Sequence, residues 1–191
     1  MAVRIRPERA VRLAGFLRNL IDPPERVLDR LSLKEGEAFL DLGAGPGHHT
    51  IPAARMVGEQ GFVTAVEAEP RVALGHKRRV LERSICNVRI LRENAETVVL
   101  ERNTFDAALL CMVLHEIDGK EAALRVVWEA MKPGGRLTVV EFLPGSFWGP
   151  PSGHRVSVAC LQGLLEALGF RDIRTGDLDR NRYYALAVKD S

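Results

Sequence analysis

Apolar residues along this chain gather in short unbroken runs, and most runs are followed by a stretch with helical periodicity. The run Phe62–Val66 is apolar except for one threonine, and Glu67 follows it directly. Continuous runs of this length are typical of parallel strands that are buried on both faces of a sheet. On this basis we predict seven strands, near residues 39–42, 62–66, 88–91, 106–112, 136–142, 170–175 and 183–188.

Helical periodicity fills most of the segments between these strands. Before the first strand, Asp22 is predicted to be the N-cap of a helix that has Pro23 in its first turn. Asp118 and Glu121 predict the start of the helix before the fifth strand, which the Pro-Gly-Gly sequence at 133–135 would end. Further helices are predicted within residues 11–21, 50–57, 70–83 and 157–168.

Strands and helices that alternate in this way predict an α/β fold. We expect a Rossmann-like, doubly wound sheet of seven mostly parallel strands, with helices on both faces and an antiparallel last strand. A chain of 191 residues with 46% hydrophobic content is long enough for one sizeable core and too short for two ordinary domains. We therefore expect a single domain over residues 1–191.

Composition and charge narrow the range of partners. The chain carries 27 basic and 25 acidic residues, so no overall field favours a nucleic acid or a membrane surface. Cys86, Cys111 and Cys160 lack the spacing of a disulfide framework or a zinc site, which favours a reducing cytoplasm and no bound metal. The longest apolar run, residues 107–114, is too short to span a bilayer.

The candidate chemistry centres on a glycine-rich turn after the first strand. Residues 41–47 read Asp-Leu-Gly-Ala-Gly-Pro-Gly, with Asp41 at the carboxyl end of the strand. Alternate glycines permit left-handed backbone angles and let a ligand approach the main chain, and the next helix directs N–H groups to the same place. The dinucleotide fingerprint does not fit, because His48 stands where its last glycine is required. The carboxylate of Asp41 favours a ligand with a cationic amine.

The end of the second strand adds an acidic side chain to this site. Ligands of doubly wound sheets bind beyond the carboxyl ends of the strands. Glu67 lies there, 24 residues after Gly43, and its carboxylate can accept hydrogen bonds from both hydroxyls of a ribose. The neighbouring Glu69 is the alternative for this role.

These motifs and their order resemble those of the class I S-adenosylmethionine (SAM)-dependent methyltransferases. The glycine turn resembles motif I of that family, and residues 105–116 resemble its motif IV. The sequence Arg-Glu-Asn-Ala-Glu at 92–96 is similar to a common Gly-Asp-Ala-Glu stretch, and residues 132–137 resemble the turn before the fifth strand. The likeness covers roughly residues 36–142 and is to small-molecule enzymes of the quinone-biosynthesis and arsenite-methylating kind. Gly-Pro-Pro-x-x-His-Arg at 149–155 extends it.

The resemblance implies SAM as the cofactor and implies which residues hold it. The implied contacts are Asp41, Gly43, Ala44, Gly45 and Gly47 in the turn, Glu67 at the ribose, Asn94 and Ala95 at the adenine, and Met112 at the exit of strand four. Asn94 stands where the family pattern has aspartate, which removes a charge but keeps an acceptor oxygen. Residues 1–35 would then form part of an acceptor pocket, residues 36–142 the cofactor-binding core, and residues 143–191 a substrate loop with the last helix and strands.

We expect the methyl acceptor to be a small molecule. Enzymes that methylate nucleic-acid bases carry Asn/Asp-Pro-Pro-Tyr/Phe after strand four, or a Pro-Cys nucleophile, whereas this chain reads Cys-Met-Val-Leu at 111–114. An arsenite enzyme would need paired thiols, which three scattered cysteines do not supply. Phe147 and Trp148 in the loop after strand five predict an aromatic cover that favours a partly apolar acceptor.

Two histidines are candidates for a general base. His115 follows strand four and His154 follows strand five, where this architecture places its acceptor, and a neutral imidazole can remove a proton. Each could equally line the pocket or bind the cofactor. His48 and His49 are a poor pair of metal ligands, because adjacent residues of a helix point about 100° apart.

The sequence therefore predicts a methyltransferase that uses SAM and a small-molecule acceptor. The alternative is a non-catalytic SAM-binding regulatory or partner subunit, which would present an apolar patch to another protein instead of an open acceptor pocket. An NAD-dependent oxidoreductase is disfavoured by the glycine spacing and by the lack of a second domain. The sequence leaves a homodimer open.

Overall fold

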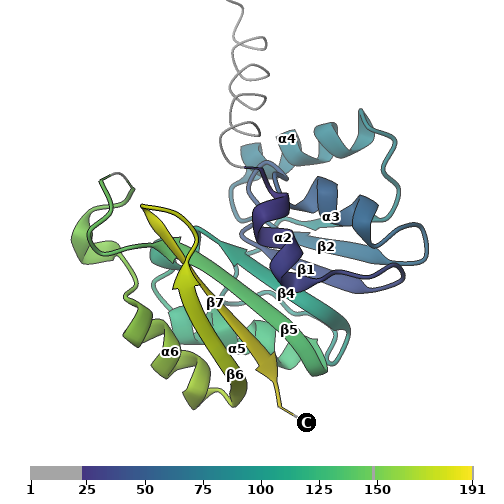
Figure 1. The fold of residues 1–191 in the computed structure, drawn as a ribbon. Coiled ribbons are helices and arrows are strands. Elements are labelled where there is room, and N and C mark those ends of the chain that lie inside the picture. Colours follow the sequence, from purple (N-terminus) through teal and green to yellow (C-terminus); the bar gives the residue numbers. More distant parts are fainter. Residues whose placement is uncertain (1–22, 148, 191) are drawn as a thin grey trace, which may run out of the picture.

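Seven strands form one sheet with the order β3-β2-β1-β4-β5-β7-β6 (Figure 1). The structure is a computed structural model that describes residues 23–147 and 149–190. The predicted helix at 11–21, Asp22 itself and the position of Trp148 lie outside these residues. The strands are β1 (Ala38–Leu42), β2 (Phe62–Val66), β3 (Val88–Leu91), β4 (Phe105–Cys111), β5 (Met131–Phe142), β6 (Phe170–Asp177) and β7 (Arg182–Lys189).

The strand directions confirm the predicted fold class. Strands β3, β2, β1, β4 and β5 pair in parallel, whereas β7 runs antiparallel to both β5 and β6. The order of the strands reverses between β1 and β4, because the chain moves outward to β2 and β3 before it returns to β4. Such a switch point leaves a crevice at the carboxyl ends of the two strands, which is where open α/β sheets bind ligands.

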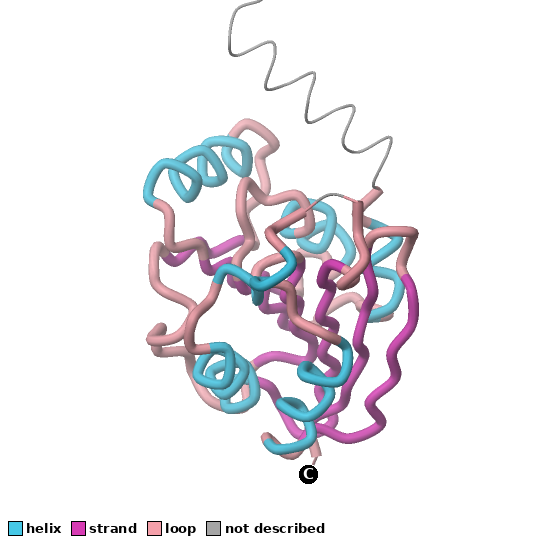
Figure 2. The backbone as a smooth tube through the Cα atoms, turned by 90° about the vertical axis from the view of Figure 1, so that its left-hand side faces the viewer, coloured by secondary structure: helices cyan, strands magenta, loops and turns pink. Residues whose placement is uncertain are grey.

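Both faces of the sheet are covered, as the uninterrupted apolar runs predicted. Successive residues of β1 point to opposite faces, so that Phe39 joins one hydrophobic cluster and Leu40 joins the other. Helices α2 (Glu25–Leu31) and α3 (Thr50–Met56) cover the first cluster. Helices α5 (Lys120–Ala130) and α6 (Val158–Ala167) cover the second. Figure 2 shows helices on either side of the strands.

Two predicted helix starts differ from the structure. Helix α5 begins at Lys120 with Gly119 as its N-cap, so Asp118 does not cap it. Helix α2 begins at Glu25 and has Pro24 as its N-cap, two residues after the predicted cap. Both predictions used a capping-box pattern, and that pattern cannot tell which of several polar or proline residues the chain uses to enter the helix.

Strand β5 is longer than predicted and contains an irregularity. It begins at Met131, immediately after α5, rather than at Arg136. The pairing with β4 jumps from Phe105↔Met131 to Ala107↔Arg136, so two steps along β4 match five along β5 and three residues are extra. The Pro-Gly-Gly sequence at 133–135 therefore bulges within the strand instead of forming a turn before it.

Candidate functional site

The three glycines of the turn have left-handed backbone angles, but they do not share one reason for being glycine. The φ angles are 75° at Gly43, 53° at Gly45 and 86° at Gly47. A Cβ on Gly43 would lie 2.3 Å from the side chain of Val113, and one on Gly47 would lie 2.4 Å from Nε2 of His76. A Cβ on Gly45 would meet nothing within 4 Å. The outer glycines thus allow close packing, and the middle one leaves space above the loop.

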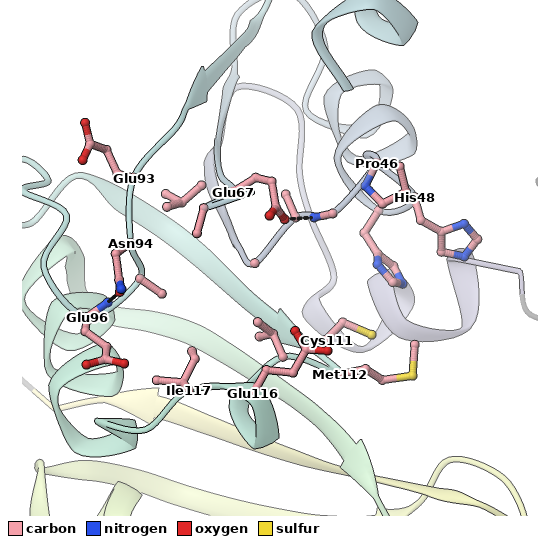
Figure 3. A pocket seen from close by; sticks show the side chains of 18 residues that line it. Pro46, His48, Glu67, Glu93, Asn94, Glu96, Cys111, Met112, Glu116 and Ile117 are labelled. Atoms are coloured by element: carbon pink, nitrogen blue, oxygen red, sulfur yellow. Dashed lines mark hydrogen bonds between the residues drawn. The ribbon is translucent and has the colours of Figure 1, made fainter. Parts of the chain in front are cut away.

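Hydrogen bonds fix this turn to the neighbouring strand. The N–H groups of Gly43 and Ala44 both donate to the carbonyl oxygen of Val66, at 2.9 Å each. Directly after that strand, Glu67 accepts from the N–H of Gly45 through Oε2 at 2.8 Å (Figure 3). Its Oε1 accepts from the N–H of Glu69, also at 2.8 Å. Glu67 therefore holds the middle of the loop, and each of its oxygens keeps a further lone pair for a ligand.

The turn forms one wall of a cavity of about 430 Å³ at the carboxyl ends of β1, β2 and β4. Figure 3 shows the side chains that surround it. Seven of the nine predicted cofactor residues line it, namely Gly43, Ala44, Gly45, Glu67, Asn94, Ala95 and Met112. Asp41 and Gly47 do not, and neither does Glu69, whose side chain caps α4 (Pro70–Leu81) by accepting from the N–H of Arg71.

Asp41 lies under the loop rather than in the cavity wall. Its side chain is buried, and Oδ2 accepts a hydrogen bond of 2.6 Å from the hydroxyl of Thr50 at the start of α3. Burial raises the pKa of Asp41 to about 6, the bond from Thr50 opposes this rise, and the charge of Glu67 adds to it. A cation in the cavity would favour the ionised form of this carboxyl.

The charges around the cavity suit a cation and oppose a phosphate. Four glutamates line it, Glu67, Glu93, Glu96 and Glu116, and none of its described lining residues is lysine or arginine. On the segment after β3, Asn94 accepts from the N–H of Glu96 through Oδ1 at 2.7 Å, which fixes the orientation of its amide. These features fit SAM, which carries a sulfonium and an ammonium group, better than a nucleotide phosphate.

His48 and His49 also line the cavity, which differs from their predicted setting. Helix α3 begins only at Thr50, so the two residues lie in the turn and at the N-cap and not side by side within the helix. Their rings contact edge to face with centroids 4.8 Å apart. Within the described part of the chain, no group of three metal-ligating side chains is brought together.

At the exit of β4, Met112 and His115 each contact a charged side chain of another strand. Met112 has a left-handed φ of 54°, and its sulfur lies 3.9 Å from Nη1 of Arg182, which is itself paired with Asp179 at 2.8 Å. His115 follows in a short 3-10 helix (Leu114–Glu116). Its Nδ1 lies 2.8 Å from Oε2 of Glu141, the penultimate residue of β5. Sequence reasoning identified Met112 and His115 but not the partners of either.

The second predicted base, His154, lies apart from the cavity. It is exposed at the end of a 3-10 helix (Ser152–His154) and is not among the lining residues. The next residue, Arg155, is the one that organises this segment. Its Nε donates to the carbonyl oxygen of Pro150 at 2.9 Å, and its Nη1 donates to those of Leu143, Pro144 and Ser146 at 3.3, 2.7 and 3.0 Å.

The described parts of the predicted acceptor elements do not line the cavity. No described residue of the loop 143–155 lines it, and Phe147 is 99% exposed, so an aromatic cover over the acceptor stays a prediction. Helix α2 packs against β5 through Val27, Leu28 and Leu31 and contributes nothing to the cavity. A side chain can be assigned to a strand end from sequence, whereas the path of a loop depends on hydrogen bonds such as those of Arg155.

The fold, the glycine turn and the acidic cavity together define a class I SAM-dependent methyltransferase. The chain matches the ubiE/COQ5 methyltransferase family over residues 24–146. It therefore belongs to that family, which confirms the predicted class and its cofactor, SAM.

Individual relatives agree with this assignment. The chain is 36% identical over 116 residues to the ubiquinone/menaquinone biosynthesis C-methyltransferase UbiE of Escherichia fergusonii. The matched segment is 60% of this chain and 46% of that protein. It is 30% identical over 164 residues to UbiE of Azotobacter vinelandii, a match that covers 82% of this chain and 60% of that protein. The chain thus spans about half the length of these curated relatives. A crystal structure of a SAM-dependent methyltransferase from Aquifex aeolicus superposes with a TM-score of 0.84 at 25% identity and covers 97% of this chain and 99% of that one.

Proposed function

We propose that this chain transfers the methyl group of SAM to a carbon of a small, hydroxyl-bearing aromatic acceptor of the quinol type. The observation that carries the proposal is the acidic cavity of about 430 Å³ on the glycine turn, because it fits a cationic cofactor and lies at the switch point of the sheet. The choice of a carbon and of a quinol rests on the relatives, which are C-methyltransferases of ubiquinone and menaquinone biosynthesis.

Residues of the cavity wall and of the layer beneath the loop have separable roles in this proposal. Glu67 would receive the ribose hydroxyls on the lone pairs that the loop leaves unused, and the charge of Asp41 would stabilise the amino group from beneath. Bound SAM supplies an electrophilic methyl group on a sulfonium. The chain's own contribution is to hold the acceptor about 3 Å from that methyl group in a water-poor site, which can lower the barrier by roughly 7–11 kcal/mol.

We assign His115 as the general base and leave His154 out of the mechanism. The side chain of His115 is 8% exposed, and the residue comes three positions after Met112, which lines the cavity. His154 is exposed on a separate loop. A base adds roughly 10²–10⁴-fold when the nucleophile must lose a proton. Phe147, whose exposed ring has no role in the core, is available to contact an apolar acceptor.

The proposal is tested by calorimetry with SAM and by methyl transfer to 1,4-naphthoquinol. We expect SAM to bind and the quinol to be methylated, and we expect Gly45→Val to abolish both because its side chain would fill the open space above the loop. Binding of SAM without transfer to quinols or other small hydroxyarenes would support the alternative, a non-catalytic SAM-binding subunit. Failure of SAM to bind would contradict the proposal altogether.

The proposal extends to partners and location. We infer that the described part of the chain works as part of one domain and that neither nucleic acid nor membrane is its substrate; no described helix is long and apolar enough to cross a bilayer. Salt-dependent binding to tRNA or duplex DNA would contradict this, since each phosphate contact makes affinity fall with salt. Cys86, Cys111 and Cys160 form no disulfide, in keeping with a reducing cytoplasm. A homodimer stays a proposal that sedimentation would test.

A further inference from the structure

The most unusual polar feature outside the cavity wall is the buried pair of His115 and Glu141. The side chain of Glu141 is fully buried and that of His115 is 8% exposed. Burying two such groups seldom stabilises a fold more than apolar residues of the same size would, because the cost of removing them from water is large. The pair therefore calls for an explanation other than stability.

Its position is set by the ends of two adjacent parallel strands. Glu141 stands near the carboxyl end of β5, and His115 follows the exit of β4. Oε2 of Glu141 lies 2.8 Å from Nδ1 of His115, while Oε1 accepts from the backbone N–H of His115 at 3.3 Å. One carboxylate thus holds both the ring and the backbone of the histidine. The ring of Phe142 contacts the imidazole edge to face, with centroids 5.3 Å apart, and restricts its rotation further.

The opposite nitrogen of the imidazole lies near one residue of the cavity wall, although His115 itself is not a lining residue. Nε2 of His115 lies 3.8 Å from Oε1 of Glu116, a residue that lines the cavity and whose side chain is 72% exposed. That separation is too long for a hydrogen bond. Tyr183 lies opposite Glu141 on β7, but its hydroxyl donates to the carbonyl oxygen of Val156 at 2.9 Å and so does not compete for the carboxylate.

We propose that Glu141 is a positioning residue that keeps the proton of neutral His115 on Nδ1, so that Nε2 is the nitrogen that accepts a proton from the acceptor. This inference rests on the proposed function. It adds that the acceptor reacts from a hydroxyl form that must lose a proton. A carboxylate that orients a catalytic histidine and stabilises its protonated form is a recurring arrangement in unrelated enzymes.

The proton and electron movements balance as follows. The hydroxyl proton of the quinol moves to Nε2 of His115, and the ring carbon beside that oxygen forms the bond to the methyl group. The bond from the methyl group to sulfur breaks, and its electron pair stays on sulfur, which becomes a neutral thioether. The ring carbon then loses its hydrogen to water as aromaticity returns, and the proton on His115 returns to the oxygen. One proton is released for each methyl group transferred.

The first test needs no acceptor. In protein labelled with ¹⁵N at histidine, long-range proton–nitrogen correlations show which ring nitrogen carries the proton, and His115→Gln identifies the signals. We expect the Nδ1–H form in the wild-type protein and a shift towards the Nε2–H form in Glu141→Leu, which keeps the site packed but removes the acceptor oxygens. The Nε2–H form in the wild-type protein would overturn the inference even if methyl transfer proceeds normally.

The second test separates positioning from structure by using two acceptors. We expect Glu141→Gln to lower kcat for 1,4-naphthoquinol on the order of 100-fold, with the SAM affinity and the acceptor KM unchanged. For 2-hydroxy-1,4-naphthoquinone, which is already ionised at neutral pH, the loss should be smaller than about tenfold because no proton has to be removed. Equal losses for both acceptors would contradict the role, and Glu166→Gln on the exposed face of α6 is the control for charge removal.

The rate losses of the two single variants should also not be additive in free energy. If Glu141 acts through His115, the double variant His115→Gln with Glu141→Gln should be no slower than His115→Gln alone. Multiplied losses would show that Glu141 acts independently. If the wild-type protein methylates neither acceptor, the proposed acceptor class is wrong, and the nitrogen measurement still decides the role of Glu141.

Discussion

A methyl group added at Gly47 should destabilise the protein because of His76, a residue of α4 that lies behind the loop. His76 is completely buried, and within the described chain neither of its ring nitrogens has a hydrogen-bond partner. In Gly47→Ala, the left-handed φ of 86° costs about 1–2 kcal/mol. The Cβ would also lie 2.4 Å from Nε2 of His76, and overpacking of this kind costs about 1–3 kcal/mol. We expect a total loss of about 2–5 kcal/mol in the free energy of unfolding.

A double-variant cycle separates the two contributions. In a His76→Ala background the ring is gone, so Gly47→Ala should cost only the backbone strain, about 1–2 kcal/mol. Urea unfolding followed by tryptophan fluorescence measures all four proteins, provided that the dependence on urea is the same in each. Gly45→Ala is the matched control, because Gly45 also has a positive φ but nothing within 4 Å of its Cβ, so its cost should be equal in both backgrounds. An equal cost of Gly47→Ala in both backgrounds would refute the packing explanation.

The same buried imidazole should make stability depend on pH. Burial, with a further contribution from the charge of Arg79, lowers the pKa of His76 from 6.5 to about 4. The unfolded chain therefore binds this proton at a higher pH than the folded protein does. The stability that this difference contributes is fully present above pH 6.5 and is lost as the pH falls towards 4, by roughly 3 kcal/mol at most. His76→Ala should lose this part of the pH dependence, and an unchanged slope between pH 4 and 6.5 would exclude a buried neutral His76.

Three further predictions concern the cofactor and the loop. Because burial raises the pKa of Asp41 to about 6, the affinity for SAM should weaken as the pH falls through 6, whereas Asp41→Asn should bind SAM about 1.5–3 kcal/mol more weakly at pH 7 and show no such pH dependence. Calorimetry at pH 5.5 and 7.5 measures this, and an equal wild-type affinity at both values would contradict the reasoning. Glu67→Gln should place an amide N–H opposite the N–H of Gly45 or Glu69 and weaken SAM binding by about 1–3 kcal/mol without unfolding the protein; unchanged affinity would remove Glu67 from the site. Arg155→Lys cannot reproduce the forked contacts to the loop carbonyls, so the KM of the acceptor should rise about tenfold at constant SAM affinity, and an equal effect on SAM would contradict a role confined to the acceptor side.

The sequence allowed the sheet and the cofactor side of the site to be predicted because both depend on local patterns. Unbroken apolar runs marked strands buried on both faces, and the acid after β2 could be placed from the rule that ligands bind at strand ends. The same rule, applied to β5, would have pointed to Glu141. Its pairing with His115, however, depends on two strands that are adjacent only in the folded sheet, 26 residues apart in the chain.

Other residues gave no signal that a single sequence could reveal. His76 reads as one more residue of a polar helix, and only the fold shows that it packs against Gly47. Thr50 became a partner of Asp41 because the first turn of α3 passes over the end of β1. His154 does not line the cavity, because hydrogen bonds of Arg155, and not the position of the Gly-Pro-Pro segment in the chain, decide where that segment runs.

Arg155 holds the loop after β5 entirely through main-chain oxygen atoms, those of Leu143, Pro144, Ser146 and Pro150. Every residue type offers the same carbonyl group, so the anchor does not depend on which side chains the loop carries. Residues such as Gly145 and Phe147 can then be exchanged while the loop keeps its path. If this loop contacts the acceptor, as we propose, variants at these two positions would change which acceptors are taken while the hydrogen bonds of Arg155 to the loop carbonyls remain.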